Sequence, residues 1–322
     1  MQRRQLLTHV GVAASTLGTP LSLWAQTPSW PRETVKLVVP FAAGGGTDRL
    51  ARLMGQRMGE KTGKTFVVEN RPGAGGNIGA ASVAKANDQH TLLFTTASVV
   101  ISPFLFARPG YDLFKDLAPI AHVSSSPLVV VVKADAAAKV IDDLRPKPGG
   151  RDLNYASPGI GTTSHLGGFL LAQKLRFSAV HVAYRGAGPA INALMSGEVD
   201  YALMAAVAVL PFIKNKQLRA LAITGTRPLP DLATAPLLGG APLNLELDNW
   251  QGMFAPITQP KPQLDQINTL VNETIKNPEV RATIYSDGAT PAGGSPAQLR
   301  ALLTRDGAKY GSIVIAAGVK PE

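Results

Sequence analysis

The chain has 322 residues, of which 45% are hydrophobic and 17% are charged, and it contains no cysteine. Its length suggests about two domains, and its hydrophobic fraction is ample for a packed core, which argues against intrinsic disorder. The lack of cysteine excludes disulfides, thiolate metal sites, iron–sulfur clusters and a cysteine nucleophile.

The formal net charge of +10 is spread along the chain. No run of Lys and Arg interleaves with aromatic residues, which make up only 6% of the chain. Aromatic platforms on which bases could stack are therefore scarce, and we expect no nucleic-acid partner.

Residues 1–25 have the pattern of an export signal. Arg3 and Arg4 begin it, an apolar stretch with small residues covers residues 10–23, and Leu23-Trp24-Ala25 forms a cleavage site before Gln26. An ordinary Sec signal and a twin-arginine signal both fit this pattern. No later run is long and apolar enough to cross a membrane, so we expect a periplasmic protein.

Beyond the signal, strand-like runs alternate with segments of helical period, which is typical of an α/β fold with mostly parallel sheets. The predicted strands cover residues 35–39, 65–69, 91–95, 128–132, 152–156, 179–184, 199–203, 218–223 and 251–255. The predicted helices cover residues 47–61, 78–85, 164–175 and 189–195. Residues 262–315 show no strand pattern and predict two or three more helices.

Four strand-to-helix junctions are rich in Gly, Ser and Thr. They cover residues 40–48, 95–98, 156–165 and 184–189. In an open α/β sheet ligands bind beyond the carboxyl ends of the strands, where the N–H groups of a helix N-terminus favour anions. One such junction is commonly a tight turn without a ligand, but four in one chain predict an anion-binding cleft.

The motifs of several enzyme and cofactor classes are missing. The chain has no phosphate-binding loop ending in GK[ST], no GxSxG and no HExxH, and Ile78 stands where a dinucleotide fingerprint needs its third glycine. Its five histidines lack the spacing of metal ligands. We therefore expect no catalysis, no metal and no cofactor.

Individual polar residues at the junctions allow more than one interpretation. Asp48 can stabilise the helix dipole, and Arg185 can clamp a carboxylate or form a salt bridge between domains. His165 fits a hydrogen bond at a helix start better than a catalytic base. The alternative is a secreted hydrolase or transferase that uses Ser157, Ser164 or His165.

From about residue 33 to its end the chain resembles the substrate-binding proteins of tripartite tricarboxylate transporters, the TctC family, also called Bug proteins. The matching stretches are residues 40–48, 69–79, 154–166, 184–186, 197–200, 218–222, 250–256, 277–281 and 317–322. Each stretch alone is weak, whereas the combination is specific.

This resemblance implies a two-lobed, type II-like periplasmic binding protein, each lobe a mostly parallel sheet flanked by helices. Lobe one would hold residues 26–127 and 252–322, and lobe two residues 128–251, with hinge segments near 128–133 and 250–255. The resemblance implies a solute-binding protein that captures a small carboxylate and delivers its ligand to transporter subunits or a membrane sensor. We expect it to be a monomer. The residues it implies for ligand binding are Phe41, Ala42, Gly46, Thr47, Asp48, Thr95, Ser98, Ser157, Thr162, Thr163, Arg185 and Ala205.

Two positions depart from the family pattern. Leu203, Met204 and Ala205 stand where many members have Phe-Asp-Asn, and Val99 stands where a histidine is common. An amino-acid ligand would want a carboxylate partner for its ammonium group, and the missing acid disfavours it. Both departures make the pocket more apolar and favour an aromatic or aliphatic carboxylate.

Overall fold

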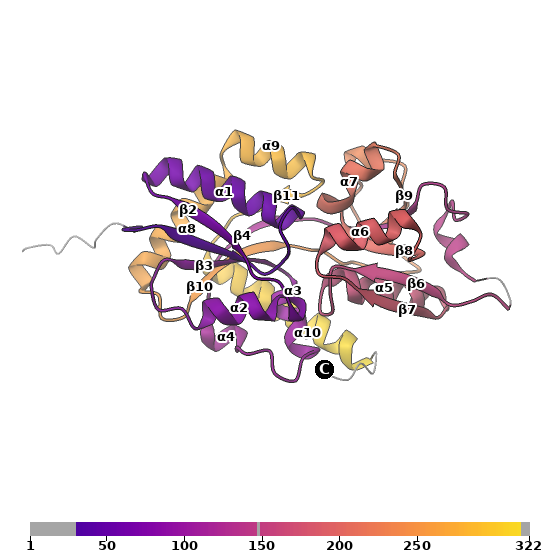
Figure 1. Cartoon of the computed structure of the whole chain (residues 1–322), viewed down its shortest axis with the longest axis horizontal. Coiled ribbons are helices and arrows are strands. Elements are labelled where there is room, and N and C mark those ends of the chain that lie inside the picture. The colour runs from indigo at the N-terminus through magenta and orange to yellow at the C-terminus, as the bar shows by residue number, and fades with distance from the viewer. Residues whose placement is uncertain (1–29, 147–148, 317–322) are drawn as a thin grey trace, which may run out of the picture.

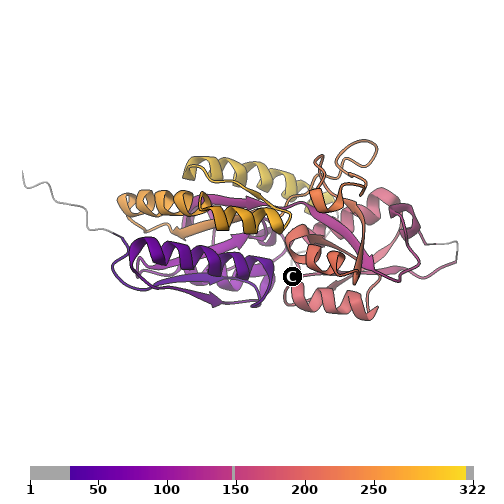
Figure 2. The same ribbon diagram turned by 90° about the horizontal axis from the view of Figure 1, so that it is seen from above.

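The computed structural model describes residues 30–146 and 149–316 (Figure 1). The predicted export signal and the family-like stretch 317–322 lie outside the described residues. The described chain forms two sheets with flanking helices, and these two α/β units lie side by side along the long axis of the molecule (Figure 2).

The first sheet has the strand order β11-β4-β10-β3-β1-β2. Its strands are β1 (Val35–Val39), β2 (Phe66–Asn70), β3 (Thr91–Thr96), β4 (Leu117–Ser125), β10 (Gln251–Pro256) and β11 (Thr290–Pro291). The helices of this unit are α1 (Gly46–Thr62), α2 (Asn77–Ala84), α3 (Ser98–Ile101), α4 (Leu113–Asp116), α8 (Lys261–Ile275), α9 (Pro278–Ser286) and α10 (Pro296–Ala316), with 3₁₀ turns at Ala74–Gly76 and Ser102–Phe104.

The second sheet has the order β7-β6-β8-β5-β9. Its strands are β5 (Leu128–Lys133), β6 (Leu153–Ser157), β7 (Ala179–Ala183), β8 (Tyr201–Ala205) and β9 (Leu218–Ile223). Its helices are α5 (Thr163–Leu175), α6 (Ala187–Ser196) and α7 (Ala206–Lys214), with 3₁₀ turns at Ile141–Leu144 and Pro230–Leu232.

Parallel pairing is confined to three helix-linked strands of each sheet. Strand β1 pairs in parallel with β2 and β3, and β6 with β7 and β8. The chain enters the second sheet through β5 and returns to the first sheet through β10. Each of these two strands runs antiparallel to both of its neighbours. The α/β fold with two lobes is therefore as predicted, but its sheets are mixed, because a strand that arrives from the other unit needs no crossover helix.

Helix α1 shows how the sequence sets one of these elements. Leu50, Met54 and Met58 recur at helical spacing and are buried against the first sheet. The helix ends at Gly63, whose φ of 67° is a left-handed conformation that glycine adopts readily.

The chain changes sheet at two neighbouring places. Residues 126–127 lead from β4 to β5, and residues 248–250 lead into β10. The two segments are bonded to each other, since Asn249 N–H donates to the Ser126 carbonyl at 2.8 Å and Pro127 forms a bridge with Asp248. Residues 128–133 and 251–255, expected to cross, are themselves strands inside the sheets.

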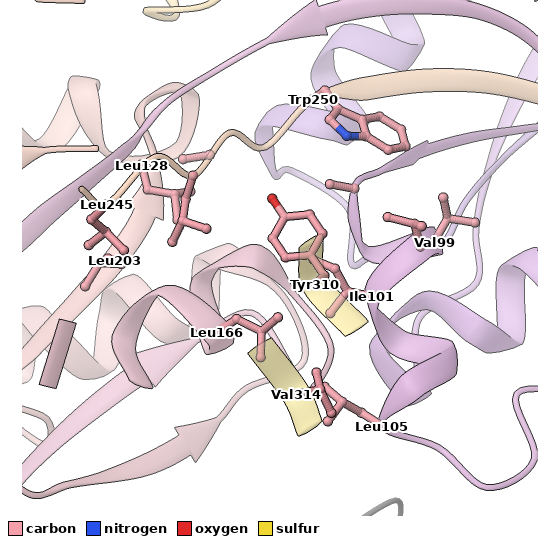
Figure 3. Packing of buried hydrophobic residues seen from close by; sticks show 14 of the residues in the cluster. Val99, Ile101, Leu105, Leu128, Leu166, Leu203, Leu245, Trp250, Tyr310 and Val314 are labelled. Carbon is pink, nitrogen blue, oxygen red and sulfur yellow. The ribbon is translucent and has the colours of Figure 1, made fainter. Parts of the chain in front are cut away.

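One hydrophobic cluster extends across both units (Figure 3). Tyr310 of α10 lies between Leu128 of β5 and Ile101 of α3, and Val314 of α10 lies beside Leu105. Next to them, the buried Trp250 donates its indole N–H to Asp306 of α10 at 2.7 Å. Helix α10 thus packs against both sides of the joint.

Of the helices in the described ranges, none combines the length and the apolar character that a bilayer span requires.

Candidate ligand-binding site

A pocket opens between the two units, where strands β1, β3, β6 and β8 end. It has a volume of about 570 Å³, counting the space at its mouth. Its lining consists of Phe41, Ala42, Gly45, Gly46, Thr47, Asp48, Thr96, Pro158, Thr162, Thr163, Ser164, Ala187, Met204, Ala205, Val207, Ala208 and Asn249. This position is the one at which open α/β sheets bind ligands.

The N-termini of four helices open onto this pocket. Helices α1, α6 and α7 begin after Gly45, Gly186 and Ala205, none of which caps its helix with a side chain. Helix α5 is capped by Thr162, whose hydroxyl accepts from the His165 N–H at 3.2 Å. Each helix N-terminus carries roughly half a positive charge, so together they favour an anionic ligand.

Asp48 braces the loop after β1. Its carboxylate accepts hydrogen bonds from Gly44 N–H at 2.9 Å, from Arg52 Nη2 at 3.0 Å and from Asn70 Nδ2 at 2.9 Å. Burial alone would raise the pKa of Asp48, but the hydrogen bonds from Arg52, Gly44 and Asn70 outweigh it and lower the pKa. The carboxylate is therefore ionised and holds the loop, and the Arg52 guanidinium that is paired with it offsets its negative charge.

Two hydroxyls in the pocket are oriented by Asn249, in the segment that leads into β10, and by Gln251, the first residue of β10. Gln251 Nε2 donates to Thr47 Oγ1 at 3.2 Å, which leaves the Thr47 proton available to a ligand. Thr163 Oγ1 donates to Asn249 Oδ1 at 3.1 Å, which leaves the Asn249 amide N–H groups as donors. The polar side chains thus gather beside residues 249–251.

Another part of the lining is apolar. Residues 204–208 contribute the side chains of Met204, Ala205, Val207 and Ala208 from the end of β8 and the first turn of α7. Phe41 and the other small apolar residues of the lining complete this wall.

The two units approach each other so closely around the pocket that only glycine fits at the contacts. A Cβ atom on Gly161 would lie 2.5 Å from the Cβ of Ser102, and one on Gly46 would lie 2.6 Å from Cγ2 of Val207. Across the mouth, Arg49 Nη2 of α1 donates to the Val207 carbonyl at 3.4 Å. The structure therefore shows the two units closed on one another.

Most of the residues expected at the site line this pocket. They are Phe41, Ala42, Gly46, Thr47, Asp48, Thr162, Thr163 and Ala205. Thr95, Ser98, Ser157 and Arg185 lie outside the lining. Thr96 is the β3 residue that faces the pocket, because successive strand residues point to opposite faces, and its hydroxyl donates to Ser98 Oγ behind it at 3.1 Å. Arg185 is exposed.

Ser157 and His165 belong to a buried stack inside the second unit. Ser157 Oγ lies 2.7 Å from Nε2 of His181, whose ring stacks on His165 with 4.0 Å between ring centroids. Burial lowers the pKa of His165 to about 4, and burial together with the charge of His165 lowers the pKa of His181 to about 3. Both rings are neutral at pH 7 and hold β6, β7 and α5 together, away from the pocket.

Sequence reasoning missed several lining residues. They are Gly45, Thr96, Pro158, Ala187, Val207, Ala208 and Asn249, while Ser164 was considered only as a nucleophile and Met204 only as a departure that makes the pocket more apolar. Gly45, Pro158 and Ala187 stand in the predicted junctions, which was the available signal. Met204, Val207 and Ala208 carry no polar signal, and Asn249 lies in a loop before a strand.

The chain matches a family model described as "Tripartite tricarboxylate transporter family receptor" over residues 50–319. It is 33% identical to the UPF0065 protein in the tcbD-tcbE intergenic region of Pseudomonas sp. (strain P51), with 97% of this chain and 94% of that protein covered. It is 30% identical to protein BugT of Bordetella pertussis, with 99% of both chains covered.

Solved structures of similar sequence have the same fold. The periplasmic binding protein BugD is 29% identical, with a TM-score of 0.84 over 91% of this chain and 100% of that chain. A Rhodopseudomonas palustris protein solved with adipate is also 29% identical, with a TM-score of 0.85 and the same coverage. MatC from the same species, solved with bound malate, is 29% identical, with a TM-score of 0.82 over 88% of this chain and all of that one.

Proposed function

Since this chain belongs to the tripartite tricarboxylate transporter family of receptors, we propose that its interlobe pocket captures a small carboxylate. As a member of this family it is a periplasmic solute-binding protein and not an enzyme. The single observation that carries the carboxylate proposal is the convergence of four helix N-termini on one pocket. The solved relatives with adipate and malate support the same ligand chemistry.

Ligand capture is coupled to closure of the two lobes. Lobe one comprises residues 26–127 and 252–322, lobe two comprises residues 128–251, and the bonded segments at 126–127 and 248–250 serve as the hinge. Because lining residues come from both lobes, a ligand contacts both only in the closed form and shifts the population towards it. Gly46 and Thr163 would bind the carboxylate through backbone N–H groups and Thr47 through its hydroxyl, while Thr162, whose own hydroxyl donates to the Gly159 carbonyl at 2.7 Å, caps α5.

The closed receptor delivers its ligand to the membrane subunits of a transporter, and the receptor itself is a monomer.

Export depends on a leader in residues 1–25. Replacing Arg3 and Arg4 together by Lys blocks export if the twin-arginine route is used and leaves it intact if the Sec route is used. Light scattering on the purified protein tests whether it is a monomer. Identifying the membrane protein that the closed form binds distinguishes a transporter from a membrane sensor.

The carboxylate proposal is tested with a panel of mono-, di- and tricarboxylates. We expect one class to raise the melting temperature and to reduce the radius of gyration measured by small-angle scattering. A matched panel of alcohols and amines without a carboxylate serves as the control and should do neither. A panel in which no carboxylate changes either quantity would overturn the proposal.

A further inference from the structure

One backbone carbonyl at the start of α7 lacks its usual donor inside its own helix. In an α-helix each carbonyl accepts from the N–H group four residues later. The residue four positions after Val207 is Pro211, which lies inside α7 and has no N–H group. The proline ring also crowds the carbonyl four residues before it. The Val207 carbonyl is therefore available to a donor on another element.

The other lobe supplies that donor. Arg49 of α1 uses Nη2 to donate to the Val207 carbonyl at 3.4 Å and to Asp287 Oδ1 at 3.3 Å. Nη2 carries two hydrogen atoms, so these two bonds use both of them. The Asp287 side chain is only 16% exposed and follows α9 in the same lobe as Arg49. Asp287 thus orients the guanidinium group within lobe one, and the bond to Val207 reaches across to lobe two.

The elements around this bond are packed closely across the joint. A Cβ atom on Gly46 would lie 2.6 Å from Cγ2 of Val207, and one on Gly288 would lie 2.5 Å from Cδ1 of Leu210. Gly46 begins α1 and Gly288 follows α9, so both helices of lobe one lie against α7 of lobe two. Val207 also lines the ligand pocket. Separation of the lobes therefore breaks the bond from Arg49 and withdraws part of the pocket wall together.

We propose that Arg49, Asp287 and the Val207 carbonyl form an interlobe latch, which Pro211 makes possible and which slows the release of the ligand. Arg49 is a positioning residue, because it acts on the ligand through α7 and is not part of the pocket lining. The proposal rests on the proposed function in that closure accompanies ligand capture. Since the bond exists only in the closed form, its loss raises the rate of ligand dissociation and leaves the rate of association unchanged.

The latch is tested first at the arginine, with adipate and malate as probes. Arg49→Gln shortens the side chain and removes its charge. We expect stopped-flow fluorescence to show dissociation about threefold to tenfold faster, since a half-exposed hydrogen bond from a charged group is lost. Lys61→Gln is the control, because it removes the same charge from the other end of α1, where Lys61 pairs with Glu273 of the same lobe. The control should release both probes as the wild type does.

Pro211 gives a test that a purely structural role would not pass. Pro211 is exposed, so Pro211→Ala opens no cavity, and it restores an N–H group that competes for the Val207 carbonyl within α7. We expect the melting temperature to hold or rise, because proline is unfavourable inside a helix, while dissociation becomes about threefold faster. In the Arg49→Gln background Pro211→Ala should not accelerate dissociation further, because the interlobe bond is already lost.

The separation of the lobes is measured without any ligand. Because the chain contains no cysteine, Ala282→Cys on α9 and Asn215→Cys at the end of α7 provide two exposed and specific labelling sites. Spin labels at these sites report the distance between the lobes by double electron–electron resonance. We expect Arg49→Gln to shift the distribution towards longer distances and Lys61→Gln to leave it as in the wild type.

The outcomes separate the latch from the receptor. Equal dissociation rates for Arg49→Gln and the wild type would overturn the latch and leave the carboxylate receptor standing. Fully additive effects of Arg49→Gln and Pro211→Ala would overturn the part assigned to Pro211. If neither adipate nor malate binds, the distance distributions decide, and equal distributions would overturn the latch. The proposed function itself fails only if no carboxylate of the panel binds.

Discussion

Single residues at the pocket act mostly by holding backbone in place. Asp48 is the clearest case, because its carboxylate collects donors from a loop, from its own helix and from the end of β2. Asn70 completes the brace by donating to the carbonyl of Phe41 at 3.0 Å. The loop that carries the anion-binding N–H groups thus depends on one buried charge.

Asp48→Asn keeps the shape of the side chain and removes its charge. Because an amide accepts fewer hydrogen bonds than a carboxylate, we expect the free energy of unfolding to fall by about 1–3 kcal/mol and ligand affinity to fall with it. Thermal melts and calorimetry measure the two effects. Arg52→Gln removes an exposed partner and should cost less, so an equal or larger loss there would contradict the brace.

The stacked histidines predict an acid-dependent loss of stability. Their folded-state pKa values lie below the usual 6.5, so protons bind the unfolded chain first as pH falls. Stability is complete above about pH 6.5 and decreases towards pH 4. His165→Phe keeps the stacking and removes one titrating ring, and we expect it to recover about 2 kcal/mol at pH 4.5 relative to the wild type. Parallel pH profiles of melting temperature for the two proteins would refute this.

For single residues, the sequence predicted the strand-to-helix junctions but not which of their side chains face the pocket. Thr95 and Thr96 are equally polar, and only the register of β3 decides that Thr96 reaches the pocket. Ser157 was expected at the ligand from the family resemblance, yet it binds His181 on the neighbouring strand. Such choices depend on partners distant in sequence.

Among whole elements, the helices with a clear apolar stripe and the buried parallel strands were predictable to within a few residues. Strand β4 and helix α7 were missed because proline interrupts both, at Pro119 and Pro211. The short β11 contradicts the expectation of a strand-free region after residue 262. Since α7 supplies the apolar wall, missing it concealed the residues that shape the pocket.

The glycine contacts between elements of the two lobes make a sharp prediction about closure. Gly161→Ala places a Cβ atom against Ser102 of the other lobe, so we expect it to weaken ligand affinity by about tenfold or more and to reduce the compaction seen by scattering. Gly197→Ala is the control, since Gly197 has nearly the same φ, 80° against 78°, and no neighbour within 4 Å of an added Cβ. If both variants weakened ligand affinity equally, backbone strain and not the contact with Ser102 would explain the loss of affinity, which would contradict the prediction.

On the scale of the whole molecule, the joint between the lobes contains a second buried carboxyl group. Asp248 lies on the crossing segment, and within the described chain nothing donates a hydrogen bond to its buried Oδ1. Burial raises the pKa of Asp248, and the negative charge of Asp306 on α10 adds to the rise. The unfolded chain therefore loses this proton first as pH rises, and the ionised carboxyl costs stability at neutral pH.

Asp248→Asn removes that cost, and we expect a melting temperature a few degrees higher at pH 7.5, with the gain shrinking towards pH 4. Glu246→Gln removes the same charge from an exposed neighbour in the same loop and should change little. A lower melting temperature for Asp248→Asn at pH 7.5 would show that the carboxylate stabilises the joint.

The two-lobed arrangement was accessible from the sequence because strands and helices alternate and because many short motifs resemble one family. How the lobes meet was not accessible. The contact between Gly161 and Ser102 and the packing of α10 over both units depend on segments far apart in the chain. Neither local propensity nor periodicity reports such contacts.

The position of β10 also has a consequence for the order in which the protein folds. This strand lies between β3 and β4 in the first sheet, yet it follows the whole second sheet in the chain. The second sheet is made from one continuous stretch, so it can form as soon as β9 is available, whereas β3 and β4 are joined in one sheet only when β10 is available. A chain threaded across a membrane from its N-terminus would therefore complete its second sheet before its first.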